Sequence, residues 1–123
     1  DSYRFEGIRL IKIDVEGHEY SVIEGASEII ASSKPALLVE IEQRHNGRPI
    51  SQVFEKILSF GYLGFFLNVG KLTSLDNFNV SNHQCIDKSS NAKGGYIYNF
   101  LFFHRDKLSA GEYDALVDGW SLK

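Results

Sequence analysis

Acidic residues follow two apolar stretches of this sequence at the point where each stretch ends. Asp14 and Glu16 close the run IRLIKIDVE, and Glu40 and Glu42 close the run ALLVEIE. Carboxylates that lie close together repel, so they must share a proton, pair with a cation or separate. A shared proton raises a carboxyl pKa and supplies a general acid or base near neutral pH, whereas a divalent cation takes the same oxygen ligands. The residues therefore predict acid–base chemistry, cation binding or contact with a ligand that bears hydroxyl groups or positive charge.

These acids need two neighbouring strands to bring them together. Residues 8–15 form a near-continuous apolar run, which is typical of a strand covered on both faces in a parallel sheet. Helical spacing predicts a helix from about 19 to 32, and residues 36–41 form a second buried strand. Parallel neighbours lie about 4.8 Å apart and end at the same edge of the sheet. We therefore expect up to four acids to crowd that edge, with His18 and His45 just beyond them.

The remaining elements complete an α/β pattern. We expect a helix over 51–60, strands over 61–67 and 96–103, and a polar connection over 68–95 whose length is typical of a functional or mobile loop. A last amphipathic helix is predicted over 109–120, with four apolar residues facing inward: Tyr113, Leu116, Val117 and Trp120. Alternating strands and helices predict a parallel sheet flanked by helices, and the last two strands, which have no helix between them, should pair antiparallel.

Composition excludes several classes of protein. A chain of 123 residues is one small domain or a piece of one, and a net charge of −3 gives no reason to expect a nucleic-acid partner. No apolar run approaches the roughly 20 residues that span a membrane. The single cysteine, Cys85, excludes an internal disulfide framework and fits a cytoplasmic location. The chain starts with DSYRFEG, has no methionine and shows no signal peptide, which indicates either removal of the initiator or an excised fragment.

Structural roles compete with functional ones at each candidate residue. Asp14 and Glu40 sit within apolar strand patterns, where a bare carboxylate is costly, so a functional role is favoured for both. Glu19 opens a helix, where an acid also interacts favourably with the helix dipole. His18 is as readily a solvent-facing loop residue as a catalytic one. Tyr96 alternates along a strand pattern, which indicates packing by default.

Four segments resemble a known family: IKIDVEGHEYSVIEGA, KPALLVEIE, FGY and YNFLFFHR. Together they are similar to the carboxy-terminal half of FkbM-type methyltransferases, over about residues 8–105. These are S-adenosylmethionine-dependent enzymes of the Rossmann-like class, and most characterised members methylate hydroxyl oxygens of sugars or natural products. The resemblance implies a small-molecule hydroxyl acceptor and the fold of a class I methyltransferase half-sheet.

The resemblance also implies roles for individual residues. Asp14 would stand at the end of the fourth strand, near the sulfonium methyl group and the acceptor, as both a catalytic and a cofactor-binding residue. Glu16 continues the signature as a second cofactor contact, and His18 and Glu40 are further catalytic candidates. Glu42 occupies a place where the family often has histidine. The final strand would be antiparallel and inserted between the fifth and sixth.

The part of the family's domain that holds the cofactor has no counterpart in this sequence. The first strand, its glycine-rich turn and the acid after the second strand are missing, so we expect residues 1–123 to be the carboxy-terminal part of one methyltransferase domain, inactive alone. A divalent metal is compatible with the acids but has no specific motif. Two alternatives are a non-catalytic interaction module, whose open sheet edges a partner would cover, and a nucleotide-sugar transferase that uses Asp14-Val15-Glu16 to bind metal.

Overall fold

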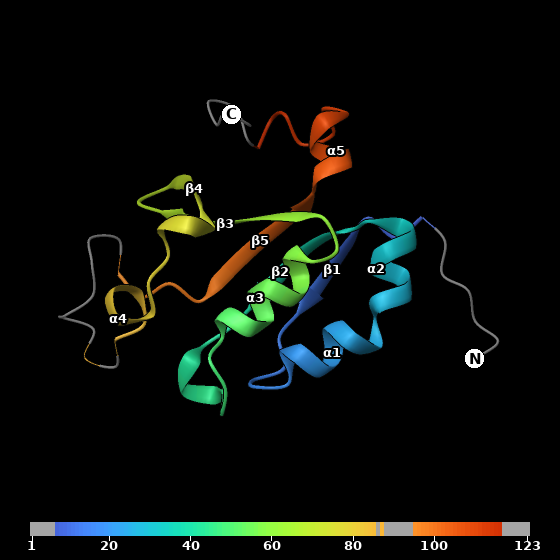
Figure 1. Cartoon of the computed structure of the whole chain (residues 1–123). Helices are drawn as coiled ribbons and strands as arrows, with labels where there is room; N and C mark the ends of the chain where they lie inside the picture. The colour runs from blue at the N-terminus through green and yellow to red at the C-terminus, as the bar shows by residue number, and fades with distance from the viewer. Residues whose placement is uncertain (1–6, 86, 88–94, 117–123) are drawn as a thin grey trace.

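The computed structural model describes residues 7–85, 87 and 95–116, which form a five-stranded mixed sheet flanked by helices (Figure 1). The strands are β1 (Leu10–Ile13), β2 (Ala36–Glu40), β3 (Tyr62–Asn68), β4 (Lys71–Ser74) and β5 (Asn99–His104). The helices are α1 (Glu19–Gly25), α2 (Ser27–Ser33), α3 (Ser51–Leu58), α4 (Val80–His83) and α5 (Arg105–Ser109), with 3-10 turns η1 (Gln43–His45) and η2 (Leu75–Asn77).

The sheet has the order β1-β2-β5-β3-β4. β1 and β2 are parallel, as the helical crossover between them requires. β5 is antiparallel to β2 on one side and to β3 on the other. The α/β class, the antiparallel final strand and its insertion between two earlier strands are therefore confirmed.

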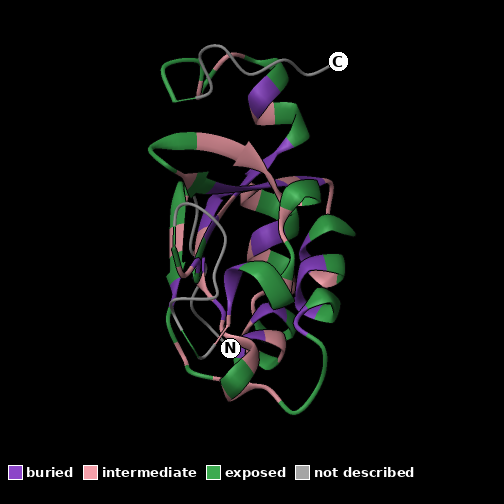
Figure 2. Ribbon diagram, turned by 90° about the vertical axis from the view of Figure 1, so that its left-hand side faces the viewer, coloured by how far each residue is buried: buried purple, intermediate pink, exposed green. Residues whose placement is uncertain are grey.

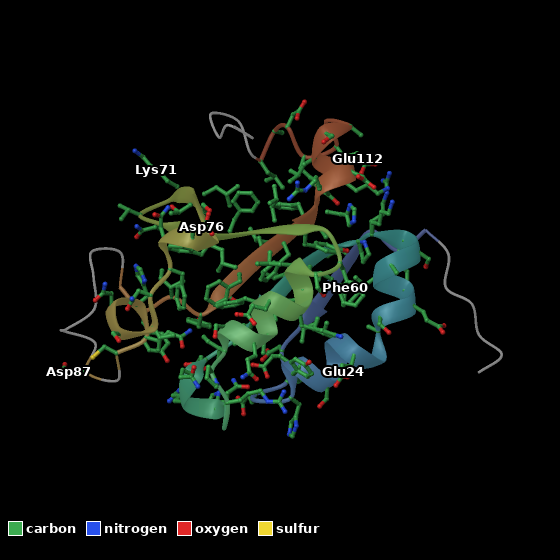
Figure 3. All side chains as sticks on the ribbon, in the orientation of Figure 1. Glu24, Phe60, Lys71, Asp76, Asp87 and Glu112 are labelled. Carbon is green, nitrogen blue, oxygen red and sulfur yellow. The ribbon has the colours of Figure 1, made fainter. Side chains whose placement is uncertain are left out.

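Helices α1, α2 and α3 cover one face of the sheet (Figures 1 and 2). Side chains on a strand alternate between faces, and the residues that point towards these helices are fully buried. They are Leu37 and Val39 of β2, Phe66 of β3, and Phe100 and Phe102 of β5. α3 contributes Val53, Phe54 and Ile57 to the same core, and Figure 3 shows side chains filling the space between this helix and the sheet.

The opposite face of the sheet is only partly covered within the described residues. Leu108 of α5 packs with Phe65 and Phe103, but Leu10 of β1 is 59% exposed. The expectation that the first strand is covered on both faces is therefore wrong for this structure. The reason is that α1, α2 and α3 all lie on one side and that β1 is an edge strand.

The polar segment over 68–95 contains more structure than its composition indicates. Val69 and Gly70 both have positive φ and form a two-residue hairpin turn between β3 and β4. The segment then forms η2 and α4, and its apolar side chains Phe78 and Val80 pack against the main core.

The last helix differs from its prediction. α5 begins at Arg105 and ends at Ser109, where the expected helix starts. The Nδ1 atom of His104 accepts the N–H of Asp106 at 3.0 Å and caps this earlier helix. Tyr113 packs on Phe103 as expected, whereas Leu116 is 63% exposed. Val117 and Trp120 lie outside the described residues.

Candidate active site at the carboxyl ends of β1 and β2

Asp14 and Glu40 lie side by side where β1 and β2 end. Ile13 pairs with Val39, and both point into the helix-covered core, so the next residues point to the open face. Glu40 donates a hydrogen bond to Asp14 when protonated, and this bond raises the pKa of Glu40. Burial and the charge of Asp14 raise the pKa further, while Lys12 opposes the change. The neighbouring Asp14 therefore favours the protonated form of Glu40.

Replacement of Glu40 by Gln should stabilise the protein at neutral pH. The pKa of Glu40 is higher in the folded chain than in the unfolded chain. The protonated form of Glu40 therefore contributes its full stabilisation below the unfolded pKa of about 4.3. This stabilisation is lost as the pH rises through the folded pKa. Glu40→Gln keeps a hydrogen-bond donor and has no charge, so it should gain about 0.5 kcal/mol at pH 7, the scale of a like-charge cross-strand pair. Urea unfolding from pH 4 to 8 measures this difference.

The gain from Glu40→Gln should shrink towards zero at pH 4. Glu55→Gln, on the exposed surface of α3, is the control and should change stability by less than about 0.5 kcal/mol. A Glu40→Gln protein that is less stable than the wild type at pH 8, or a gain that does not depend on pH, would contradict the raised pKa of Glu40.

Glu42 has the opposite electrostatic environment. Burial by itself would raise the pKa of Glu42, but hydrogen bonds from Tyr96 and Arg44, with the nearby positive charge, outweigh it and lower the pKa. The Nε atom of Arg44 lies 3.0 Å from the Glu42 carboxylate, and Nδ1 of His45 lies 3.5 Å from it. Burial and the bond to Glu42 together raise the pKa of the Tyr96 hydroxyl to about 12. The pKa values of two neighbouring carboxyl groups, Glu40 and Glu42, are thus shifted in opposite directions. Opposite shifts of this kind usually separate a general acid from a carboxylate that stays ionised.

The structure does not bring Glu16 and His18 into the carboxyl pair. Glu16 is exposed on the turn after β1, with φ of 37°, and its charge acts on Arg44. His18 is also exposed and starts α1 without a side-chain capping bond. Three of the four acids, Asp14, Glu40 and Glu42, therefore interact electrostatically with one another. The histidine paired with one of these acids is His45 and not His18.

Gly17 and Glu19 connect the first acidic segment to the second. Gly17 has φ of 96°, and a Cβ atom there would overlap the backbone carbonyl oxygen of His45. Glu19 is 1% exposed, and its Oε1 atom lies 3.5 Å from the Nδ2 atom of Asn46, which also donates to the Glu42 carbonyl oxygen at 2.8 Å. Glu19 also lies in the first turn of α1, where an acid interacts favourably with the helix dipole. The two residues therefore dock the loop over 42–46 onto the start of α1.

Sequence reasoning missed two contributors to this edge. Tyr96 was assigned to packing, yet its hydroxyl group binds Glu42. Asn46 had no motif that could have identified it. No group of three or more His, Cys, Asp and Glu side chains within the described residues is placed to hold a metal ion.

The fold and the site define a class of protein. A mixed sheet with an antiparallel strand inserted beside parallel ones, helices on its flank and acids at its carboxyl edge is consistent with a Rossmann-like methyltransferase. The model of the methyltransferase FkbM domain matches residues 1–65, which is more than half of the 123 residues. The chain belongs to the FkbM methyltransferase family, as the resemblance predicts.

The family match extends from the start of the chain into β3, so it includes both acidic segments. β4, α4 and β5 lie beyond it. No curated protein and no solved structure matches the chain. None of the helices in the described part of the chain has the length and apolar character needed to cross a membrane.

Proposed function

We propose that this chain forms the acceptor side of an S-adenosylmethionine-dependent O-methyltransferase that acts on a hydroxyl group of a sugar or natural product. The observation that supports this most is the pair of neighbouring carboxyl environments at one sheet edge. Asp14 and burial raise the pKa of Glu40, whereas Tyr96 and Arg44 outweigh burial and lower the pKa of Glu42. Ligands of open α/β sheets bind outside this edge.

Methylation of a hydroxyl group requires a base at the acceptor oxygen. Asp14 presents an exposed carboxylate beside Glu40, at the point where β1 ends. That carboxylate accepts the hydroxyl proton as the oxygen–carbon bond forms. Glu42 and Tyr96 supply an anionic acceptor and a hydroxyl group that orient the substrate. When bound, S-adenosylmethionine supplies the electrophilic methyl group.

The residues present fit one end of that cofactor. Asp14 and Glu16 are both exposed, follow the same strand, and carry the negative charge that complements a sulfonium or ammonium group. They would hold the cationic part of S-adenosylmethionine. The sequence contains no glycine-rich turn between a strand and a helix that would hold the rest. We propose a cytoplasmic location, which the single cysteine favours.

Isothermal titration calorimetry tests the assignment of this chain to the acceptor side. The 123-residue chain should bind S-adenosylmethionine more weakly than about 1 mM, because roughly 4 kcal/mol of binding free energy or less is available from one end of the ligand. A micromolar dissociation constant would contradict the assignment.

The reaction itself is tested in a protein that carries the complete domain. Methyl-labelled S-adenosylmethionine should transfer its label to oxygen when a panel of sugars and polyols is supplied. Transfer to nitrogen or carbon alone would overturn the O-methyltransferase proposal.

A non-catalytic interaction module is the second candidate, and the exposed Leu10 on the edge strand β1 favours it. This candidate predicts no methyl transfer, whether or not the acids are replaced. It also predicts that Leu10→Lys abolishes association with a partner.

A further inference from the structure

Gln84, which follows α4, is a buried amide with three backbone partners. Its side chain is 7% exposed. The Oε1 atom accepts the N–H of Gln43 at 2.7 Å, and Nε2 donates to the carbonyl oxygens of Ile41 at 2.7 Å and Ile97 at 2.9 Å. All three distances are those of well-formed hydrogen bonds.

The three partners of Gln84 surround one pair of functional side chains. Ile41 and Gln43 are the neighbours of Glu42 in the sequence, and Ile97 follows Tyr96. The Tyr96 hydroxyl group donates to the Glu42 carboxylate. A single side chain therefore ties together the two backbone segments that carry the two members of this pair.

An amide is the side chain that this position requires. Gln offers one carbonyl acceptor and two N–H donors, and here it uses both kinds of group. A carboxylate could accept from Gln43 but could not donate to two carbonyl groups. An apolar residue would leave the N–H of Gln43 and the carbonyl groups of Ile41 and Ile97 with fewer partners, which destabilises the fold.

We propose that Gln84 is a positioning residue that holds Glu42 and Tyr96 against each other beside the Asp14–Glu40 pair. The proposal rests on the proposed function in assigning this edge of the sheet to the acceptor. It gives α4 and the residue after it a defined role, because Gln84 braces the acidic edge.

Several other groups act on Glu42 and must be separated from Gln84 in a test. Arg44 and His45 face it from its own loop, and Glu40 faces it from β2. Glu16 acts on Arg44 from the turn after β1. Among the hydrogen bonds of the described residues, none joins the side chain of one of these groups to Gln84.

The test is the carboxyl pKa of Glu42 in Gln84→Met, followed by carbon-13 NMR. We expect the pKa of Glu42 to rise by about 0.5, because Tyr96 no longer donates to it in one fixed geometry. Gln52→Met, on the exposed surface of α3, should leave it unchanged. Tyr96→Phe should raise it with Gln84 in place, which shows that the reporter responds to the lost hydroxyl group.

A folded Gln84→Met protein with an unchanged Glu42 pKa would overturn the proposal, since a purely structural role lowers stability without moving that value. If Gln84→Met does not fold, hydrogen exchange of the wild-type protein decides. The Gln43 amide should be protected at least tenfold more than the exposed amide of Gly47, and equal exchange would overturn the proposal. These measurements use no cofactor or acceptor, so their failure is distinct from a failure of the proposed reaction.

Discussion

Gly17→Ala is expected to lower the free energy of unfolding by about 3 kcal/mol. Gly17 has φ of 96°, a conformation that costs an L-residue about 1–2 kcal/mol. The added Cβ atom would also overlap the His45 carbonyl oxygen, and overpacking of this kind costs about 1–3 kcal/mol. The His45 backbone has little freedom to move, because Asn46 and Gln84 bond the same loop on either side. Urea unfolding measures the change.

Gly25→Ala is the matched control for Gly17→Ala. Gly25 ends α1 without positive φ, and a Cβ atom there would meet nothing within 4 Å. This substitution should be neutral or stabilising by up to about 1 kcal/mol. Equal stability of Gly17→Ala and wild type would show that the signature glycine does not dock the loop over 42–46.

Asp14→Asn is expected to reduce kcat for methyl transfer by about 10²–10⁴-fold, in a protein that carries the complete domain. Asn has nearly the same shape as Asp and can still accept a hydrogen bond from Glu40, but it cannot take a proton from the acceptor hydroxyl group. Because Asp14 is exposed, the fold should be retained. Transfer of labelled methyl groups from S-adenosylmethionine to the acceptor panel gives the rate.

Asp76→Asn separates this effect from a general loss of charge. Asp76 is exposed in η2, which follows β4 at the edge of the sheet away from β1 (Figure 3). Its replacement should leave kcat unchanged. If Asp14→Asn also left kcat unchanged, Asp14 would have no role as the base, and Glu40 would be the next residue to replace.

Local patterns predicted much of the fold. α3 was expected because Val53, Phe54 and Ile57 recur at helical spacing, and these residues are buried on one face of the helix. β2 was expected from a continuous apolar run and is a buried strand. Both predictions succeeded because the period of hydrophobic residues is a local property that burial preserves.

Predictions that depended on distant partners succeeded less often. The helix expected over 109–120 failed because His104 caps a helix that starts at Arg105, so the chain turns earlier than its own pattern indicates. The expectation that β1 is buried on both faces failed because burial depends on which helices cover the sheet. An apolar run in the sequence does not indicate which face of the strand packs against a helix.

The sequence by itself determined that acids end two adjacent parallel strands. The reason is that hydrophobic periodicity, and the position of each acid within its apolar run, are local properties of the chain. Only the tertiary structure decided which acids meet. The turn through Glu16 and Gly17, both with positive φ, leaves Glu16 and His18 outside the Asp14–Glu40 pair. Insertion of β5 beside β2 then brings Tyr96 to Glu42 across more than fifty residues. Such a contact depends on strand order in the folded sheet, which no local pattern encodes.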